Sequence, residues 1–292
     1  MKPLEALALA GRLVRHPAAH KGDAGKVVLI GGAPTMSGAL VLAGQAALFS
    51  GAGWIVMLML DSQSAHGMVL QPELMVHDAN LYAPDDALAQ IGPDAVAIGP
   101  GLGTSVQAKH WLEAALRWHG PLVIDADALN LLSSDPALLN KLHARPFPTS
   151  ITPHPGEAAR LLQVTSQVVQ ADRVACMAQL VAMTQAIVVL KGQHTLVASP
   201  THSAHQCMQG NAGMAVGGIG DVLTGCIAAL AAQGIHHGLN LWEATCLGVQ
   251  LHASAGDDLV SQGIGPIGLT PSELASALLP LLRRLVNLHA AR

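Results

Sequence analysis

The chain has 292 residues, of which 51% are apolar and 12% are charged, and its formal net charge is −4. A chain of this length and composition can bury a large core, which excludes a disordered protein. With only 15 Lys and Arg residues and no basic stripe, nucleic acid is a poor partner, and four scattered Cys residues without a Cys-x-x-Cys pair exclude a disulfide scaffold.

The segment Leu40–Leu60 carries no charge and is long enough in principle to cross the ~30 Å hydrocarbon core of a membrane. Gly51 and Gly53 interrupt it, however, and the apolar run that follows ends at Asp61. We therefore predict a helix, a tight turn and a buried strand, and no membrane span. Because no secretory leader pattern opens the sequence, we expect a cytoplasmic protein.

Short runs rich in Val and Ile alternate with longer stretches rich in Ala and Leu, which is typical of a mostly parallel sheet covered by helices. The predicted strands are Lys26–Ile30, Trp54–Leu60, Asp94–Ile98, Pro121–Asp125, Thr149–Thr152, Ala186–Leu190 and Thr195–Ala198. The predicted helices are Ser37–Ser50, Ser105–Trp118, Gln167–Thr184, Asp221–Gln233, Leu241–Val260 and Pro271–Leu288. Without a repeat or linker, we predict one α/β domain over residues 1–292, with a loosely tied N-terminal extension over residues 1–20.

The strongest functional signal lies at residues 210–225, which read Gly-Asn-Ala-Gly-Met-Ala-Val-Gly-Gly-Ile-Gly-Asp-Val-Leu-Thr-Gly before a predicted helix. Glycine lets the backbone approach a ligand closely, and the free N–H groups at a helix start attract an anion. We predict that Gly218 and Gly220 bind phosphate there. Asp221 would repel a phosphate, so we interpret it as a base that accepts a proton from an attacking hydroxyl. The alternative is that Asp221 only caps the helix.

This string resembles the signature of the NAD(P)H-hydrate dehydratases, and its part Gly218–Asp221 is similar to the Gly-x-Gly-Asp loop of ribokinase-like enzymes. The resemblance implies a three-layer α/β/α ribokinase-like fold with a mostly parallel central sheet. It also implies dehydration of the S epimer of hydrated NADH or NADPH, with Mg²⁺ and ADP or ATP as co-substrate. The nucleotide would phosphorylate the ring hydroxyl, Asp221 would be the catalytic base, and loss of phosphate would restore the cofactor. ADP is the expected donor, and ATP is the alternative.

Two glycine turns that follow predicted strands resemble substrate loops of this family. They span Gly31–Ala39 and Gly99–Gly103. The resemblance implies that Ala39, Gly101 and Gly103 contact the hydrated dinucleotide. Taken alone, each segment could instead be a tight strand-to-helix turn that needs glycine for steric reasons.

Polar residues follow two further predicted strands. The string Asp-Ala-Asp-Ala-Leu-Asn at residues 125–130 is shared with the family, and Asp125 and Asp127 are candidate ligands of Mg²⁺ or of substrate. Asp127 could equally cap the next helix. In the motif Ile151–Glu157, the resemblance implies that His154 binds substrate, since an imidazole can donate a hydrogen bond to a hydroxyl or phosphate.

The segment after the predicted strand Ala186–Leu190 is similar to the family's Lys-Gly-x-x-Thr nucleotide segment. The resemblance implies that the adenine nucleotide contacts Lys191, Gly192, Gln193, His194 and Thr195. A lysine can neutralise phosphate charge. The alternative is a plain β-hairpin with glycine in its turn.

Three residues depart from the family pattern: Met36 stands where an aromatic residue is common, and Val216 and Ile219 stand where threonine is frequent. We expect modest effects, because backbone amides can still bind phosphate. The chain starts too near the first motif for an epimerase domain, so the resemblance implies a separate epimerase. Apolar content and the resemblance together indicate a homo-oligomer, for which a tetramer is typical.

Two other functions use the same features. A ribokinase-like kinase for a small alcohol such as hydroxymethylpyrimidine, hydroxyethylthiazole or a sugar also needs an anion hole and an Asp base, and it would accumulate a phosphorylated product. A non-catalytic nucleotide-binding regulator would bind nucleotide without turnover. The intact Asp221 argues against a regulator.

Overall fold

The computed structural model describes residues 1–67 and 71–290, and its ten described strands form one sheet. In sheet order these strands are β1 (Lys2–Pro3), β10 (His202–Gln206), β9 (Leu196–Ser199), β8 (Ile187–Leu190), β7 (Thr149–Ile151), β6 (Leu122–Ile124), β5 (Ala95–Ile98), β2 (Lys26–Gly31), β3 (Trp54–Met59) and β4 (Met75–Asp78). All neighbouring strands are parallel except the pairs β8–β9 and β9–β10, which are antiparallel. The predicted, mostly parallel sheet is therefore confirmed.

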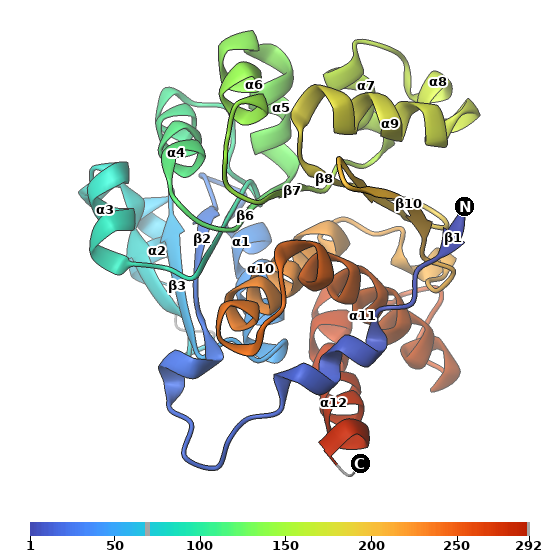
Figure 1. Cartoon of the computed structure of the whole chain (residues 1–292). Coiled ribbons are helices and arrows are strands. Elements are labelled where there is room, and N and C mark those ends of the chain that lie inside the picture. The colour runs from blue at the N-terminus through green and yellow to red at the C-terminus, as the bar shows by residue number, and fades with distance from the viewer. Residues whose placement is uncertain (68–70, 291–292) are drawn as a thin grey trace.

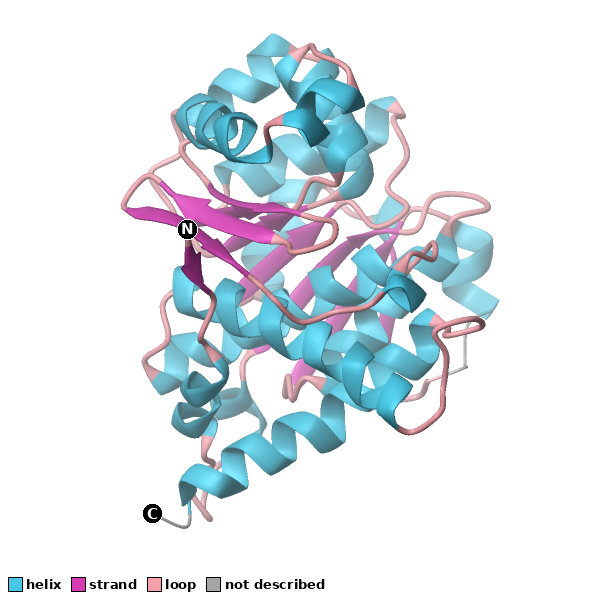
Figure 2. Cartoon of the chain, turned by 90° about the vertical axis from the view of Figure 1, so that its right-hand side faces the viewer, coloured by secondary structure: helices cyan, strands magenta, loops and turns pink. Residues whose placement is uncertain are grey.

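Helices cover both faces of this sheet (Figure 2). The α-helices are α1 (Ser37–Phe49), α2 (Ser62–Gly67), α3 (Pro84–Ile91), α4 (Val106–Arg117), α5 (Ala126–Ser134), α6 (Pro136–His143), α7 (Pro155–Leu162), α8 (Ser166–Ala171), α9 (Arg173–Thr184), α10 (Ile219–His237), α11 (Leu241–Ser261) and α12 (Pro271–Ala290). Short 3-10 turns are η1 (Leu7–Leu13), η2 (Lys21–Ala24), η3 (Ala79–Leu81) and η4 (Ala212–Met214). In Figure 1, α4 to α7 and α9 lie above the sheet, and α10, α11 and α12 lie below it.

Strand β2 shows how the sequence produces two cores. Val27 and Leu29 pack with residues of α1, α10 and α11, whereas Val28 and Ile30 pack with residues of α4 and α5. Alternate residues of a strand point to opposite faces, so a strand covered on both sides must be apolar throughout. The result is the three-layer α/β/α architecture predicted from the resemblance.

The chain order of the strands reverses between β2 and β5. From β2 the chain continues to β3 and β4 on one side, while β5, β6 and β7 extend the sheet on the other. In open α/β sheets, ligands bind in the crevice outside the carboxyl ends of the strands at such a switch point. The loops that follow β2 and β5 are therefore the expected floor of a binding site.

The predicted strands from residue 26 to residue 199 are all present, each within one residue of its predicted ends. The predicted helix Gln167–Thr184 is wrong, because α8 ends at Ala171 and α9 starts at Arg173. Between them Asp172 has φ −144° and accepts a hydrogen bond from the N–H of Ala175 at 2.9 Å. The side chain of Asp172 thus caps a new helix and interrupts the predicted one.

The N-terminal segment is more firmly attached than expected of a loosely tied extension. Lys2 and Pro3 pair with β10, and the backbone N–H groups of Ala6 and Leu7 donate to the side chain of Gln250 in α11. Leu4 is buried as well. The first residues are therefore part of the packed structure.

One described helix, α10, is long and apolar enough by length and composition to cross a membrane, but 78% of that window is buried within the protein. It packs against α1, α11 and the sheet, as a core helix does. The segment Leu40–Leu60 forms α1, a turn and β3, as predicted.

Candidate active site

The glycine-rich loop ends at the start of α10. Gly218 is the N-cap residue and has φ 97°, a left-handed conformation that favours glycine. A Cβ on Gly218 would also lie 2.7 Å from Leu42. The backbone N–H groups of Gly220 and Asp221 have no acceptor among the described residues. Free amides at a helix start form a binding site for an anion.

Asp221 lies in the first turn of α10, three residues after the N-cap, and its carboxylate accepts no hydrogen bond from the part of the chain that the structure describes. The alternative that Asp221 is the N-cap is therefore wrong. Burial raises the pKa of Asp221 to about 7, and repulsion from Asp125 adds to this rise, while Lys191 opposes it. A carboxyl that titrates near neutral pH is suited to exchange a proton with a substrate.

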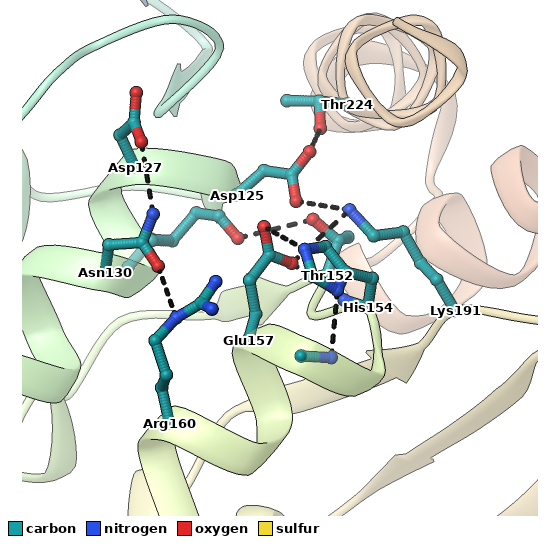
Figure 3. A network of polar contacts seen from close by, with 11 residues as sticks. Asp125, Asp127, Asn130, Thr152, His154, Glu157, Arg160, Lys191 and Thr224 are labelled. Atoms are coloured by element: carbon teal, nitrogen blue, oxygen red, sulfur yellow. Dashed lines mark hydrogen bonds and ion pairs between the residues drawn. The ribbon is translucent and has the colours of Figure 1, made fainter. Parts of the chain in front are cut away.

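Asp125 and Lys191 form the buried centre of the site (Figure 3). Asp125 is 1% exposed, and its two oxygens accept hydrogen bonds from Lys191 Nζ and from Thr224 Oγ1 of α10, both at 2.7 Å. Lys191 Nζ also lies 3.8 Å from Glu157. Burial by itself lowers the pKa of Lys191, but the carboxylates of Asp125 and Glu157 outweigh it and raise this pKa. Lys191 is therefore a charged ammonium at the base of the site.

The start of α10 lies directly beside this pair. A Cβ built on Gly220 would be 3.1 Å from Lys191 Nζ and 3.7 Å from Asp125 Oδ2. The free amides, the ammonium and the unpaired carboxylate of Asp221 thus face one small region. Such a region can hold a phosphoryl group and take a proton from its acceptor.

His154 is the N-cap of α7. Its Nδ1 accepts a hydrogen bond from the N–H of Gly156 at 2.9 Å, and Glu157 accepts from the N–H of His154 at 2.7 Å. His154 Nε2 lies 3.2 Å from Glu157 Oε1. Burial, and then the charge of Lys191, lowers the pKa of His154. The imidazole is half exposed at the rim, and both of its nitrogens already have partners in the protein.

Asp127 connects two loops. Its Oδ2 accepts a hydrogen bond from the N–H of Gly103 at 2.9 Å, and its Oδ1 accepts one from Asn130 at 3.1 Å. Asn130 in turn accepts a hydrogen bond from Arg160 of α7 at 2.9 Å. Asp127 lies inside α5 and does not cap that helix, whose N-cap is Asp125.

The loops after β2 and β5 lie against each other at the switch point. The N–H of Gly32 donates to the carbonyl of Pro100 at 3.0 Å, and the N–H of Ala33 donates to the carbonyl of Gly101. A Cβ on Gly101, which has φ 56°, would lie 3.2 Å from Ala39 and would collide with Met36. The structure thus brings Ala39 and Gly101 together, and a steric need for glycine is present here.

The segment Lys191–Thr195 forms the turn of an antiparallel hairpin between β8 and β9. Gly192 has φ 135°, and Arg173 of α9 donates to the carbonyls of Leu190 at 2.9 Å and Gln193 at 2.6 Å. The hairpin alternative is therefore correct as a description of the backbone. Of this hairpin, Lys191 is the residue that contacts the Asp125 cluster within the described chain.

The side chains of the described residues offer no ready-made Mg²⁺ site. Within residues 1–67 and 71–290, no group of three His, Cys, Asp or Glu residues is arranged to hold a metal ion. Both oxygens of Asp125, and both of Asp127, already accept hydrogen bonds from the protein. Mg²⁺ commonly binds through one or two carboxylates together with substrate phosphates. This arrangement is compatible with such a site, in which the phosphates of a bound substrate supply ligands, and not with a site made by protein side chains alone.

The three departures from the family pattern lie in different surroundings. Ile219 is 7% exposed and packs in the core with α11, so a hydroxyl at this position would not face the anion site. Met36 and Val216 are exposed. At the rim of the site, Met36 Cε would be 3.6 Å from a Cβ built on Gly103.

Comparison with known proteins places this site in a family. The family model described as NAD(P)H-hydrate dehydratase matches residues 27–279. The chain belongs to the NAD(P)H-hydrate dehydratase family. The ADP-dependent (S)-NAD(P)H-hydrate dehydratase of Neisseria meningitidis is 40% identical over 262 residues, covering 88% of this chain and 85% of that protein.

Longer members of the dehydratase family also match. The bifunctional NAD(P)H-hydrate repair enzyme of Escherichia coli is 40% identical over 273 residues, covering 94% of this chain and 50% of that enzyme. The chain thus spans about half the length of most of the curated relatives that it matches.

Solved structures confirm the ribokinase-like fold of this dehydratase family member. The ADP/ATP-dependent NAD(P)H-hydrate dehydratase of Bacillus subtilis, co-crystallised with ATP and Mg²⁺, has a TM-score of 0.83 at 27% identity, covering 97% of this chain and 99% of that one. A hydroxyethylthiazole kinase from Pyrococcus horikoshii has a TM-score of 0.60 at 14% identity, covering 96% of this chain and 92% of that one, which shows the fold alone.

Three residues of this site are not identified by the sequence motifs alone. Glu157 and Thr224 lie inside the motifs described above without an assigned role, and Arg160 lies outside them. Thr224 follows Asp221 by three positions, a spacing that puts two side chains on one face of a helix. That spacing could have identified Thr224 from the sequence.

Proposed function

We propose that this chain catalyses the nucleotide-driven dehydration of the S epimer of hydrated NADH or NADPH, with ADP as the donor. One observation carries the proposal: Asp221, whose pKa is about 7, lies unpaired beside the free amides at the start of α10. Membership of the dehydratase family and the ADP-dependent relative support it.

The reaction balances without a further reactant. The hydroxyl on the reduced nicotinamide ring attacks the terminal phosphoryl group of ADP, and Asp221 accepts the hydroxyl proton. AMP leaves while the amides of Gly218 and Gly220 and the ammonium of Lys191 stabilise the charge on the migrating phosphoryl group. The ring C–O bond then breaks with its electron pair on phosphate, and loss of a proton from the adjacent ring carbon forms the double bond.

The site divides into two sides in this proposal. Ala39, Gly101, Gly103 and His154 contact the hydrated dinucleotide, near the switch point between β2 and β5. The adenine nucleotide lies along the hairpin, in contact with Lys191, Gly192, Gln193, His194 and Thr195. Mg²⁺ would accompany the nucleotide phosphates, in keeping with the hydrogen bonds that the oxygens of Asp125 and Asp127 already accept from the protein.

The test follows the absorbance of NADH. Purified protein is incubated with hydrated NADH, Mg²⁺ and either ADP or ATP. We expect ADP to restore the NADH band with one AMP and one phosphate released per NADH, and only one epimer of a mixture to be consumed. A higher rate with ATP would change the donor, and no recovery with either nucleotide would refute the proposed reaction.

We also propose a cytoplasmic location, a separate epimerase as functional partner, and a homo-oligomer, with a tetramer as the expected form. The bifunctional relatives are named as repair enzymes, which supports a link between dehydration and a second activity. Addition of an epimerase to the assay mixture would then allow the remaining epimer to be consumed.

The second candidate is a small-molecule kinase, which the fold shared with hydroxyethylthiazole kinase supports. The two functions differ in their products. A kinase would accumulate a stable phosphorylated alcohol, whereas the dehydratase releases inorganic phosphate.

A further inference from the structure

Helix α11 holds the glycine-rich loop at both of its ends. Near the first end, Asp257 accepts hydrogen bonds from the N–H of Gly210 at 2.9 Å and from Nδ2 of Asn211 at 3.0 Å. At the other end, Nε2 of His252 lies 3.0 Å from the carbonyl oxygen of Ile219, the first residue of α10. The loop that forms the anion site is therefore tied to a second helix at both of its ends.

The contact of His252 fixes the state of its imidazole. A carbonyl oxygen can only accept a hydrogen bond, so Nε2 must carry the hydrogen and donate it. His252 is 7% exposed, and burial lowers its pKa to about 4. The side chain is thus neutral at neutral pH, with one tautomer selected by its partner.

The carbonyl of Ile219 and the N–H of Gly220 belong to the same planar peptide group and point in opposite directions. A donor held against the carbonyl therefore fixes the plane in which the N–H points. It also draws electron density toward the carbonyl oxygen, which makes the N–H a stronger donor, as in chains of hydrogen bonds. The Gly220 N–H has no acceptor among the described residues, and Gly220 itself lies beside Lys191, whose Nζ would be 3.1 Å from a Cβ built on this glycine.

We infer that His252 is a positioning residue, which aims and polarises the Gly220 N–H so that it binds the transferred phosphoryl group. This inference rests on the proposed function for its catalytic part. Two observations carry it: the hydrogen bond of a buried imidazole to the carbonyl of Ile219, and the unpaired N–H of the same peptide group. His252 itself touches neither nucleotide nor substrate in this arrangement.

Three variants separate this role from simple packing. His252→Gln can place its amide N–H near the position of Nε2 and keeps the donor. His252→Leu has a similar size without a donor, and His252→Asn is polar but too short to reach the same carbonyl. If His252 only fills space, kcat in the three variants should follow their stability. If it positions the Gly220 N–H, His252→Gln should keep its kcat while the other two variants lose it.

We expect His252→Leu and His252→Asn to lower kcat by about 10- to 100-fold and to raise KM for the nucleotide by a smaller factor, since a hydrogen-bond donor in an oxyanion hole acts mainly on the transition state. His252→Gln should retain kcat within about 3-fold, a margin far below the loss of one such donor. Thermal unfolding of each variant shows whether it is folded. Equal losses of kcat in all three variants, or an unchanged kcat in Leu and Asn, would overturn the inference.

A binding measurement tests the inference independently of dehydration. Calorimetric titration of wild type and variants with ATP, ADP and AMP measures how much affinity each added phosphate provides. We expect the step at the phosphate that occupies the anion site to shrink in Leu and Asn and to persist in Gln, with AMP affinity unchanged in all three. An undiminished step in His252→Leu and His252→Asn would overturn the inference whether or not wild type acts on hydrated NADH. A diminished step in a protein that is inactive on hydrated NADH would mean that only the proposed function has failed.

Discussion

Asp221 is distinguished from the other carboxylates of the site because its side chain has no hydrogen-bond partner among the described residues. The ammonium of Lys191 lies 2.7 Å from Asp125 and 3.8 Å from Glu157. Thr224 donates to Asp125 as well. Burial raises the pKa of Asp221, and the negative charge of Asp125, which one shared ammonium does not cancel, raises it further. A base poised near neutral pH results from this combination.

Replacement of Asp221 by Asn keeps the shape of the side chain and removes the base. We expect turnover to fall by about 10²- to 10⁴-fold, the usual contribution of a general base, while the dissociation constant for ADP changes little. Steady-state kinetics and calorimetric titration measure the two quantities. Comparable losses of turnover and of ADP binding would indicate that Asp221 organises the loop and does not act as a base.

The same variant has a signature in stability that follows from the sign of the pKa shift. The pKa of Asp221 is raised from 3.8 to about 7 in the folded protein, so between these values the folded state keeps a proton that the unfolded chain has released. This residue therefore destabilises the fold progressively as the pH rises from about 4 to about 7, and fully above that range. Asp221→Asn should melt at a higher temperature than wild type at pH 8, and the difference should vanish toward pH 4.

At the scale of elements, α10 depends on close contact with α1. A Cβ on Gly225 of α10 would overlap the backbone carbonyl of Ala43, which cannot move aside as a flexible side chain could. The small residues along α1 and α10 let the two helices approach, and this approach fixes where the free amides of α10 point. The glycines of the signature string therefore have different roles: some leave room for a ligand, and others allow α10 to pack closely against α1.

Two alanine substitutions in this string test that division. Gly225→Ala should reduce the free energy of unfolding by about 3 kcal/mol or more, the upper range for an overpacked core. Gly217→Ala is the control, because a Cβ there meets no atom within 4 Å and the residue is exposed. Urea unfolding compares both with wild type, and equal stability of the two variants would contradict the close packing of α1 and α10.

The sequence predicted the elements whose apolar pattern is strong and missed those without it. Most residues of the inner strands are apolar, because both faces are covered, and the sequence predicts the ends of these strands within one residue. Strand β10, which lies between β9 and the two-residue edge strand β1, contains two histidines and has no buried residue, so no apolar pattern marks it. Helix α7 begins with Pro155 and Gly156, which suggest a turn, and its N-cap is His154, a residue that is not a usual N-cap.

At the scale of the whole molecule, the site consists of loops from distant parts of the chain. The sequence could predict that several strand ends share one edge of the sheet, since parallel strands end on the same side. It could not predict which carboxylate pairs with Lys191, because that partner, Asp125, is 66 positions away. The bond from Thr224 to Asp125 joins residues 99 positions apart. Pairings of this kind depend on helix rotation and side-chain reach, which no local pattern encodes.

The N-terminal segment connects the edge of the sheet with the helical layer that positions the loop. The N–H of Leu4 donates to Gln206 of β10 at 2.8 Å, and the next turn, η1, packs on α11 and α12. Figure 1 shows this segment crossing the helices below the sheet. A segment held in this way contributes to the stability of the whole chain.

Leu4→Ala tests that contribution at a side chain that is 4% exposed. We expect a loss of about 2 to 4 kcal/mol in the free energy of unfolding, because truncation of a buried Leu removes apolar contacts and leaves a cavity. Glu5→Ala, next to it but exposed, should change the same quantity by less than about 0.5 kcal/mol. If Leu4→Ala proves as stable as Glu5→Ala in chemical unfolding, the N-terminal segment does not stabilise the fold. Helix α11 would then hold the glycine-rich loop without a contribution from this segment.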